Sequence, residues 1–274
     1  MLFKILGPLE IQGRRQTGSP VRRAILTAFL LRAGQSIGVG ELATLLWDCP
    51  PPSATANIRS HLTGLRRDLD DAVPGLGGRI KTYRGTQVSY GLQVSPEECD
   101  LTAFSRHTQI GRGLLLRGEV ESAAQTLEEA LALWRGPFGP DLPETRWFGA
   151  HAAGLSGARF TAYEQLFTSC VMANRTDMLS YRIETVLAEA PYRQRLWELL
   201  AAVHCIEGDA ASALETIKRC QELFADDLGL DLPPSVGAMR MAALSWDRAQ
   251  ALRLLCSGAS ATGGGAAPPL SRVS

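Results

Sequence analysis

Residues 53–69 read SATANIRSHLTGLRRDL, and this stretch predicts an amphipathic helix. Ser53 is a favourable N-cap, and the three prolines directly before it stop any helix from entering from upstream. Apolar side chains recur with the spacing of one helix face, at Ile58, Leu62, Leu65 and Leu69. The stretch therefore predicts a helix of about four turns that packs one side against a core.

The opposite face of this predicted helix is basic and hydrogen-bonding and carries no acid. Its members are Ala56, Asn57, Ser60, Thr63 and Arg67, with Arg59 on the flank. Such a face suits the major groove of a DNA duplex, where base edges offer donors and acceptors. A solvated helix surface with ordinary arginines has the same composition, so this face alone leaves both interpretations open.

The distribution of charge divides the chain into two parts. Its 274 residues suffice for two domains, each with its own core. The net charge is zero, but residues 1–95 carry 12 Lys and Arg against 6 Asp and Glu, whereas residues 96–274 carry 16 against 22. A basic front part joined to an acidic remainder is typical of a nucleic-acid module attached to an interaction module.

The segments around the quoted stretch predict a winged helix-turn-helix over residues 1–95. Residues 2–11 favour a pair of short strands, and helices are expected over 21–33 and 41–47. Residues 79–94, RIKTYRGTQVSYGLQV, alternate as a β-hairpin does. Basic and polar side chains lie near its expected tip, at Lys81, Arg84 and Gln87. A hairpin directly after the third helix is typical of a wing, although a structural edge ribbon has the same pattern.

Two arginines, Arg22 and Arg23, stand at the start of the helix expected over 21–33 and oppose its dipole. Contact with DNA phosphates compensates such a conflict, so we expect both to anchor the DNA backbone, with the wing cations on phosphates or in the minor groove. The complete set of predicted DNA-binding residues is Arg22, Arg23, Asn57, Arg59, Ser60, Thr63, Arg67, Lys81 and Arg84.

The second part of the chain predicts an all-α domain of tetratricopeptide-like helical hairpins over residues 96–255. Residues 118–134, GEVESAAQTLEEALALW, align without gaps with residues 208–224, GDAASALETIKRCQELF, and residues 174–191 form a weaker third copy. The proline-containing segment 134–147 predicts an irregular crossover. Residues 256–274 are rich in Gly, Ala, Ser and Pro and predict a disordered tail. The predicted fold class is therefore mainly α with a small β component.

In this order, several stretches resemble those of the Streptomyces antibiotic regulatory proteins, over about residues 2–250. They are LGPLEI, RRAILTAFLL, ELATLLW and LTGLRRDL in the front part, and ALALWRGP and DLGLDLPPS further on. The resemblance implies an OmpR-like winged helix followed by a bacterial transcriptional activator domain. The sequence departs from the family pattern at Val21, where a basic residue is usual, and at Tyr90-Gly91, where the order Gly-Tyr is usual.

This resemblance also implies a function and partners. It implies a transcriptional activator of secondary-metabolite (antibiotic) genes that binds direct repeats in promoter DNA as a homodimer. It further implies recruitment of RNA polymerase and its sigma factor. The residues by themselves leave two alternatives: a helical-repeat scaffold whose basic domain docks onto a protein, and a regulator whose helical domain senses a ligand.

The remaining sequence features give no reason to expect an enzyme, a cofactor or a metal site. The sequence contains no phosphate-binding loop, nucleophile elbow or glycine-rich dinucleotide turn. Its six cysteines are scattered and form no metal-ligand spacing or disulfide framework. Because neither a signal peptide nor an apolar run of membrane-spanning length is present, we expect a cytoplasmic protein associated with the nucleoid.

Overall fold

The computed structural model describes residues 1–15 and 18–261, with side chains up to residue 256. It divides into two compact units. The first comprises Met1–His107 and Glu129–Arg159, and the second comprises Thr108–Glu128 and the described residues from Phe160 onward. Helices α4 (Asp100–Leu116), α5 (Val120–Leu131) and α6 (Arg146–Met172) contribute residues to both.

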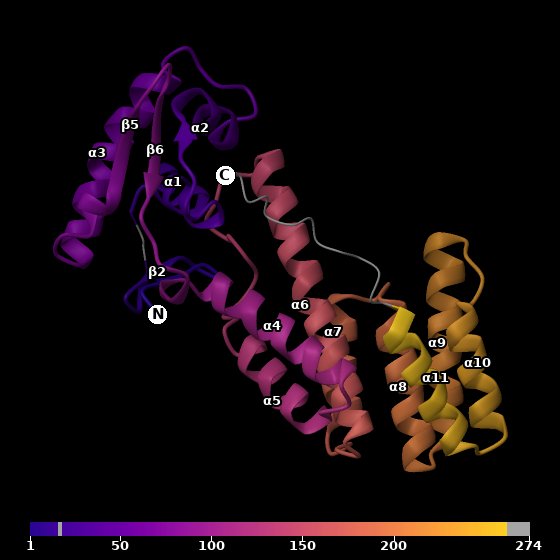
Figure 1. Cartoon of the computed structure of the whole chain (residues 1–274). Coiled ribbons are helices and arrows are strands. Elements are labelled where there is room, and N and C mark those ends of the chain that lie inside the picture. The colour runs from indigo at the N-terminus through magenta and orange to yellow at the C-terminus, as the bar shows by residue number, and fades with distance from the viewer. Residues whose placement is uncertain (16–17, 262–274) are drawn as a thin grey trace. The chain divides into compact units, whose positions relative to one another are not determined.

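The front of the first unit is a winged helix-turn-helix, which confirms the predicted fold class. Its helices are α1 (Pro20–Leu31), α2 (Val39–Leu46) and α3 (Ala54–Ala72). One antiparallel sheet has the order β1-β2-β3 and consists of β1 (Phe3–Lys4), β2 (Glu10–Ile11) and β3 (Arg14–Arg15). The other has the order β4-β6-β5 and consists of β4 (Ile37–Gly38), β5 (Ile80–Arg84) and β6 (Val88–Leu92). Figure 1 shows α3 running alongside the β5–β6 hairpin.

The apolar stripe of α3 is the part of the sequence that attaches this helix to the core. All four of its members are buried in one cluster with side chains of α1 and α2: Ile58, Leu62, Leu65 and Leu69. Burial of a Leu or Ile side chain contributes about 1.5–3 kcal/mol. Because the stripe occupies one side of α3 only, the opposite side is left to solvent.

Residues from the middle of the chain complete this core. The segment predicted as an irregular crossover is irregular, since α5 ends at Leu131 and α6 begins at Arg146. Phe138 and Phe148 are nevertheless buried in the same cluster as the helices of the winged helix. The Thr145 hydroxyl donates to the Leu45 carbonyl at 2.9 Å, in a buried position. The predicted domain limit at residue 95 lies inside the first unit.

A partly buried ionic cluster joins the N-terminal β1–β2 hairpin to the middle of the chain. The Asp100 carboxylate is 1% exposed and accepts hydrogen bonds from the backbone N–H groups of Ile5 and Leu6 at 2.8 and 3.0 Å. The Arg135 guanidinium lies 3.5 Å from Asp100 and 2.8 Å from Glu10. We call Asp100, Arg135 and Glu10 the basal cluster. Burial raises the pKa of Asp100, and the two backbone donors and Arg135 oppose that rise.

Gly7 allows this close approach. Its φ of +130° lies where L side chains are rarely found, and a Cβ there would be 3.1 Å from the Arg135 Cβ and 3.3 Å from the Gly136 nitrogen. Arg135 in turn donates to the Pro8 carbonyl at 2.9 Å. Residues 6–8 (LGP) and residues 134–137 (WRGP) therefore pack closely together although they lie far apart in sequence.

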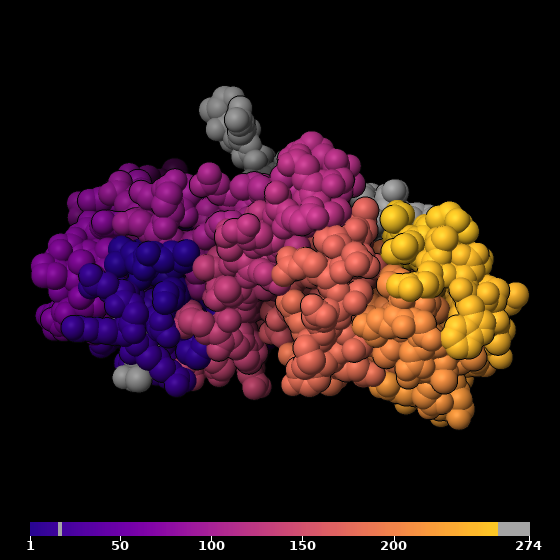
Figure 2. Space-filling model, turned by 90° about the horizontal axis from the view of Figure 1, so that it is seen from below, coloured from indigo at the N-terminus to yellow at the C-terminus, as the bar shows by residue number. Residues whose placement is uncertain are grey.

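The second unit is built from antiparallel helices, as predicted. They include α7 (Leu179–Glu189), α8 (Gln194–Glu207), α9 (Ala210–Leu228), α10 (Pro234–Leu244) and α11 (Arg248–Ala261). Gly208 ends α8 in the left-handed conformation, and Asp209 caps α9 by accepting from the Ser212 N–H at 2.9 Å. Figure 2 shows the orange and yellow atoms of α8 to α11 as one continuous surface.

The C-terminal segment that was predicted to be disordered begins within a helix. Helix α11 continues to Ala261, with Leu255 buried on its inner side. Residues 262–274 lie outside the described part of the chain.

Candidate nucleic-acid interface

The outer face of α3 is exposed from Ala56 to Arg67 and carries no acid there, whereas Asp70 and Asp71 are exposed in the last turn. All six residues predicted for this face are exposed: Ala56, Asn57, Arg59, Ser60, Thr63 and Arg67. The Asn57 side chain donates to the Ser53 hydroxyl at 3.2 Å, and the Thr63 hydroxyl donates to the Arg59 carbonyl at 3.1 Å. Ser53 occupies the N-cap position with an αR backbone and makes no side-chain cap, so its predicted capping bond is absent from the structure.

Four exposed cations lie on α3 and the hairpin. Among the residues that the structure describes, no ion pair involves Arg59, Arg67, Lys81 or Arg84, and all four are exposed. The partly buried His61 on α3 has a pKa lowered first by burial and then by the nearby Arg22, which favours its neutral form. The positive charge of this surface therefore comes from arginine and lysine side chains.

Arg66 connects α3 to the hairpin. Its guanidinium donates to the Ile80 carbonyl and to the Thr82 hydroxyl, both at 3.1 Å. Because side chains alternate along a strand, Arg84 lies on the same face of β5 as Thr82, toward α3, and Lys81 lies on the other face. The two predicted wing cations thus point to opposite sides of the sheet.

The register of the hairpin explains the Tyr90-Gly91 order. Tyr90 is buried and pairs with Thr82 on β5 and with Ile37 on β4. A Cβ on Gly91 would lie 2.8 Å from the Gln35 carbonyl oxygen. A side chain at position 91 would therefore push β6 away from the loop before β4.

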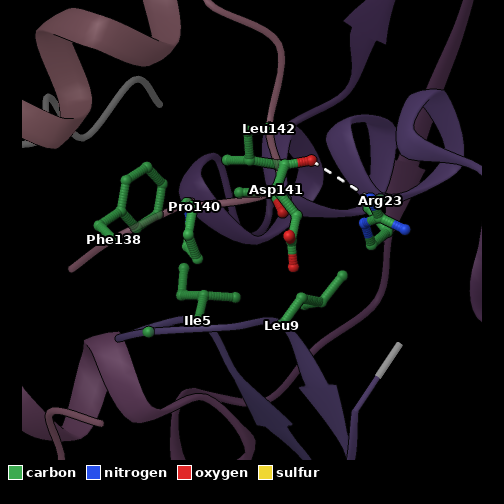
Figure 3. Close-up of a pocket in the computed structure, with 10 residues that line it drawn as sticks. Ile5, Leu9, Arg23, Phe138, Pro140, Asp141 and Leu142 are labelled. Carbon is green, nitrogen blue, oxygen red and sulfur yellow. Dashed lines mark hydrogen bonds between the residues drawn. The ribbon is translucent and has the colours of Figure 1, made fainter. Parts of the chain in front are cut away.

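Both arginines at the start of α1 have partners inside the protein. Arg22 forms an ion pair with Asp68 of α3, in which Nη1 donates to both carboxylate oxygens at 2.9 and 3.0 Å. Arg23 donates to the Gly18 carbonyl and, at 3.4 Å, to the Asp141 carbonyl. Figure 3 shows this last contact beside a small cavity lined by Ile5, Leu9, Phe138, Pro140 and Leu142. Its volume of about 10 Å³ corresponds to about one water molecule, too little for an organic effector.

The sequence interpretation missed three residues that organise this surface. The sequence predicts neither a base contact nor a wing contact for Arg66, and it indicates no role for Gly64 or Asp68. The glycine in the middle of a helix was the available signal, because such a residue usually marks a close approach. The partners of Arg66 and Asp68 carry no local signal in the sequence.

In the described part of the chain, no group of three His, Cys, Asp or Glu side chains is placed to hold a metal ion. No helix of that part has both the length and the apolar character that crossing a bilayer requires.

Residues 99–244 match the bacterial transcriptional activator domain. The chain belongs to this family. The resemblance to the Streptomyces antibiotic regulatory proteins is also confirmed, because its relatives include regulators of that type from Streptomyces.

The similar proteins are transcriptional regulators. The chain is 30% identical to the transcriptional regulatory protein EmbR of Mycobacterium tuberculosis over 241 residues, which cover 86% of this chain and 61% of EmbR. It is 26% identical to the regulatory protein DnrI of Streptomyces peucetius over 238 residues, 84% of this chain and 87% of DnrI. The chain thus spans about three fifths of the length of EmbR.

A solved structure confirms the fold. The structure of Mycobacterium tuberculosis EmbR in complex with a low-affinity phosphopeptide superimposes with a TM-score of 0.84 at 28% identity. The match covers 95% of this chain and 69% of that chain.

Proposed function

We propose that this protein is a sequence-specific DNA-binding transcriptional activator. One observation carries the proposal: between Ala56 and Arg67, α3 presents an exposed face without acids, and beside it lies a hairpin whose Lys81 and Arg84 form no ion pair in the described part of the chain. A polyanion with readable base edges is the partner that such a surface suits. The related proteins that regulate transcription support the same assignment.

In the proposed complex α3 lies in the major groove. Asn57, Ser60 and Thr63 face base edges, and Arg59 and Arg67 contact base edges or neighbouring phosphates. Lys81 and Arg84 contact phosphates, or the minor groove, from the wing. The sequence predicts Arg22 and Arg23 as phosphate anchors, but both donate to partners inside the protein, which favours a structural role for Arg22.

The proposal also covers the oligomeric state, the binding partners and the cellular location of the protein. They are a homodimer on direct repeats in promoters of secondary-metabolite genes, recruitment of RNA polymerase with its sigma factor, and a cytoplasmic location at the nucleoid. Support for them comes from membership of the family. A single recognition helix reads few base pairs, so a second copy on a repeated site is the usual way to reach sufficient specificity.

The test uses the full chain, because the winged helix shares its core with residues 129–159. Duplexes are enriched by the wild-type chain from a random-sequence library, and the enriched and starting pools are titrated in gel shifts at several salt concentrations. Arg67→Ala is expected to lose about 1–3 kcal/mol of binding to the enriched duplexes only. Arg175→Ala, an exposed arginine of the second unit, is the control. Failure of the wild-type chain to enrich any duplex contradicts the proposal and favours the protein-docking scaffold.

A further inference from the structure

Arg22 lies across α3 in a notch that Gly64 provides. The guanidinium bonds to both Asp68 carboxylate oxygens, at 2.9 and 3.0 Å, and each side chain is only about a third exposed. A Cβ on Gly64 would lie 2.4 Å from Arg22 Cζ and 2.5 Å from Nε. Contacts that short do not occur between real atoms, so the position of Arg22 requires a residue without a side chain at position 64.

Three residues connect α1 to α3. Arg22 stands in the first turn of α1, whereas Gly64 and Asp68 lie one turn apart on α3. Both bonds to Asp68 come from Nη1, and Cζ, Nε and Nη2 of the same planar group lie in the notch at Gly64, so the guanidinium is held at two places and has a defined orientation. The arrangement therefore limits both the rotation of α3 about its axis and its distance from α1.

We propose that Arg22, Gly64 and Asp68 form a clamp that positions α3 for DNA recognition, so that Arg22 is a positioning residue. The proposal rests on the proposed DNA-binding function. Asp68 directly follows Arg67, and Gly64 directly follows Thr63. A rotation of α3 at the clamp therefore moves these two predicted contacts relative to the groove.

Removing the Asp68 carboxylate has opposite effects on DNA binding in the two cases, a clamp and a phosphate contact by Arg22. If Arg22 binds phosphate, Asp68 competes with DNA for it, and removal of the carboxylate strengthens binding and raises the salt dependence. If Arg22 is a clamp, removal of the carboxylate releases α3, and binding to the selected sequence weakens although the protein has lost a negative charge.

The decisive variant is Asp68→Asn in the full chain. Its preference for the enriched over the starting duplexes is expected to fall about tenfold, with the salt slope unchanged, whereas a variant that only lost stability keeps its preference at temperatures below unfolding. The matched control is Glu184→Gln, which breaks the two-point pair with Arg219 at 2.7 and 3.1 Å in the second unit. Equal or tighter binding by Asp68→Asn, or a salt slope larger by about one, overturns the clamp.

A second set of variants tests the notch. Gly64→Ala is expected to lose preference as Asp68→Asn does, although alanine favours a helix by about 1 kcal/mol over glycine. Gly154→Ala on α6, where a Cβ meets nothing within 4 Å, is the control and is expected to keep the preference. In an Arg22→Ala background, Gly64→Ala should cause no further loss, because the group that the new Cβ meets is absent. A further loss there contradicts the clamp.

Enrichment of duplexes by the wild-type chain tests the proposed function independently of the clamp. If it enriches no duplex, the DNA-binding function itself is overturned, and the clamp with it. If it enriches duplexes and Asp68→Asn retains their preference, the function stands and the clamp is wrong.

Discussion

The basal cluster and the outer face of α3 use arginine in opposite ways. Arg135 lies between the carboxylates of Asp100 and Glu10 and against a backbone carbonyl. Arg59 and Arg67 extend from an exposed helix face, and the structure describes no acid paired with either. The same side chain thus fastens one region internally and leaves the other with uncompensated charge.

The difference shows which charges are available to a partner. An arginine whose donors are used inside the protein contributes little to binding a polyanion, because breaking a partly buried pair leaves a charge without its partner. An exposed arginine loses only solvent contacts and releases counterions from the nucleic acid. Arg22, paired with Asp68, belongs with the first kind although the sequence suggested the second.

The largest expected effect comes from removing the centre of the basal cluster. Asp100→Ala leaves the Ile5 and Leu6 N–H groups without an acceptor and is expected to cost about 3–5 kcal/mol of stability. Urea unfolding measures this cost. Glu184→Ala, which removes an exposed ion pair, should cost less than about 1 kcal/mol. Similar losses for both variants would remove the distinction between buried and exposed charge.

A smaller effect is expected at Gly7, where the backbone of the N-terminal β1–β2 hairpin meets Arg135. Gly7→Ala introduces a Cβ 3.1 Å from the Arg135 Cβ at a positive φ and is expected to cost about 1–3 kcal/mol. Gly13→Ala, at a φ of +76°, meets nothing within 4 Å, so it reports the cost of a positive φ without a steric contact. Urea unfolding of the two variants should show the larger loss for Gly7→Ala, and equal losses would mean that the close packing against Arg135 adds nothing.

The exposed region is tested by its salt dependence. Arg84→Ala is expected to weaken binding to enriched and unselected duplexes about equally and to reduce the salt slope by about one, because a phosphate contact is lost. Arg175→Ala removes an equal charge from the second unit and should leave the slope as it is. A slope unchanged by Arg84→Ala places this residue away from the phosphates.

The smallest effect concerns acid stability. The Arg79 guanidinium donates to Glu98 and, as the largest cause, lowers the pKa of that carboxyl below its usual 4.5. The stabilisation is therefore complete above pH 4.5 and is lost as the pH falls through the lower folded-state value. Glu98→Gln should flatten the decline of stability in this acid range relative to wild type, as thermal melts between pH 3 and about 6 would show. Glu97→Gln, at an adjacent exposed position, should retain the wild-type decline.

Much of the winged helix was predictable because its signals are local. The stripe from Ile58 to Leu69 determined which side of α3 is buried, and the alternation in residues 79–94 located the hairpin. The exposed positions of Asn57, Thr63 and Arg67 followed from the same periodicity. The roles of Arg22 and Arg66 did not, because their partners lie on other elements.

The sequence by itself determined the elements, their apolar faces and the separation of basic from acidic parts. Each of these depends on the spacing of near neighbours, which helix and strand geometry convert directly into a face. Only the tertiary structure decided which cations are paired. The partners Arg22 and Asp68 are 46 positions apart, and Arg135 and Pro8 are 127 apart. No local periodicity encodes such a contact, because it forms only when packing brings the two elements together.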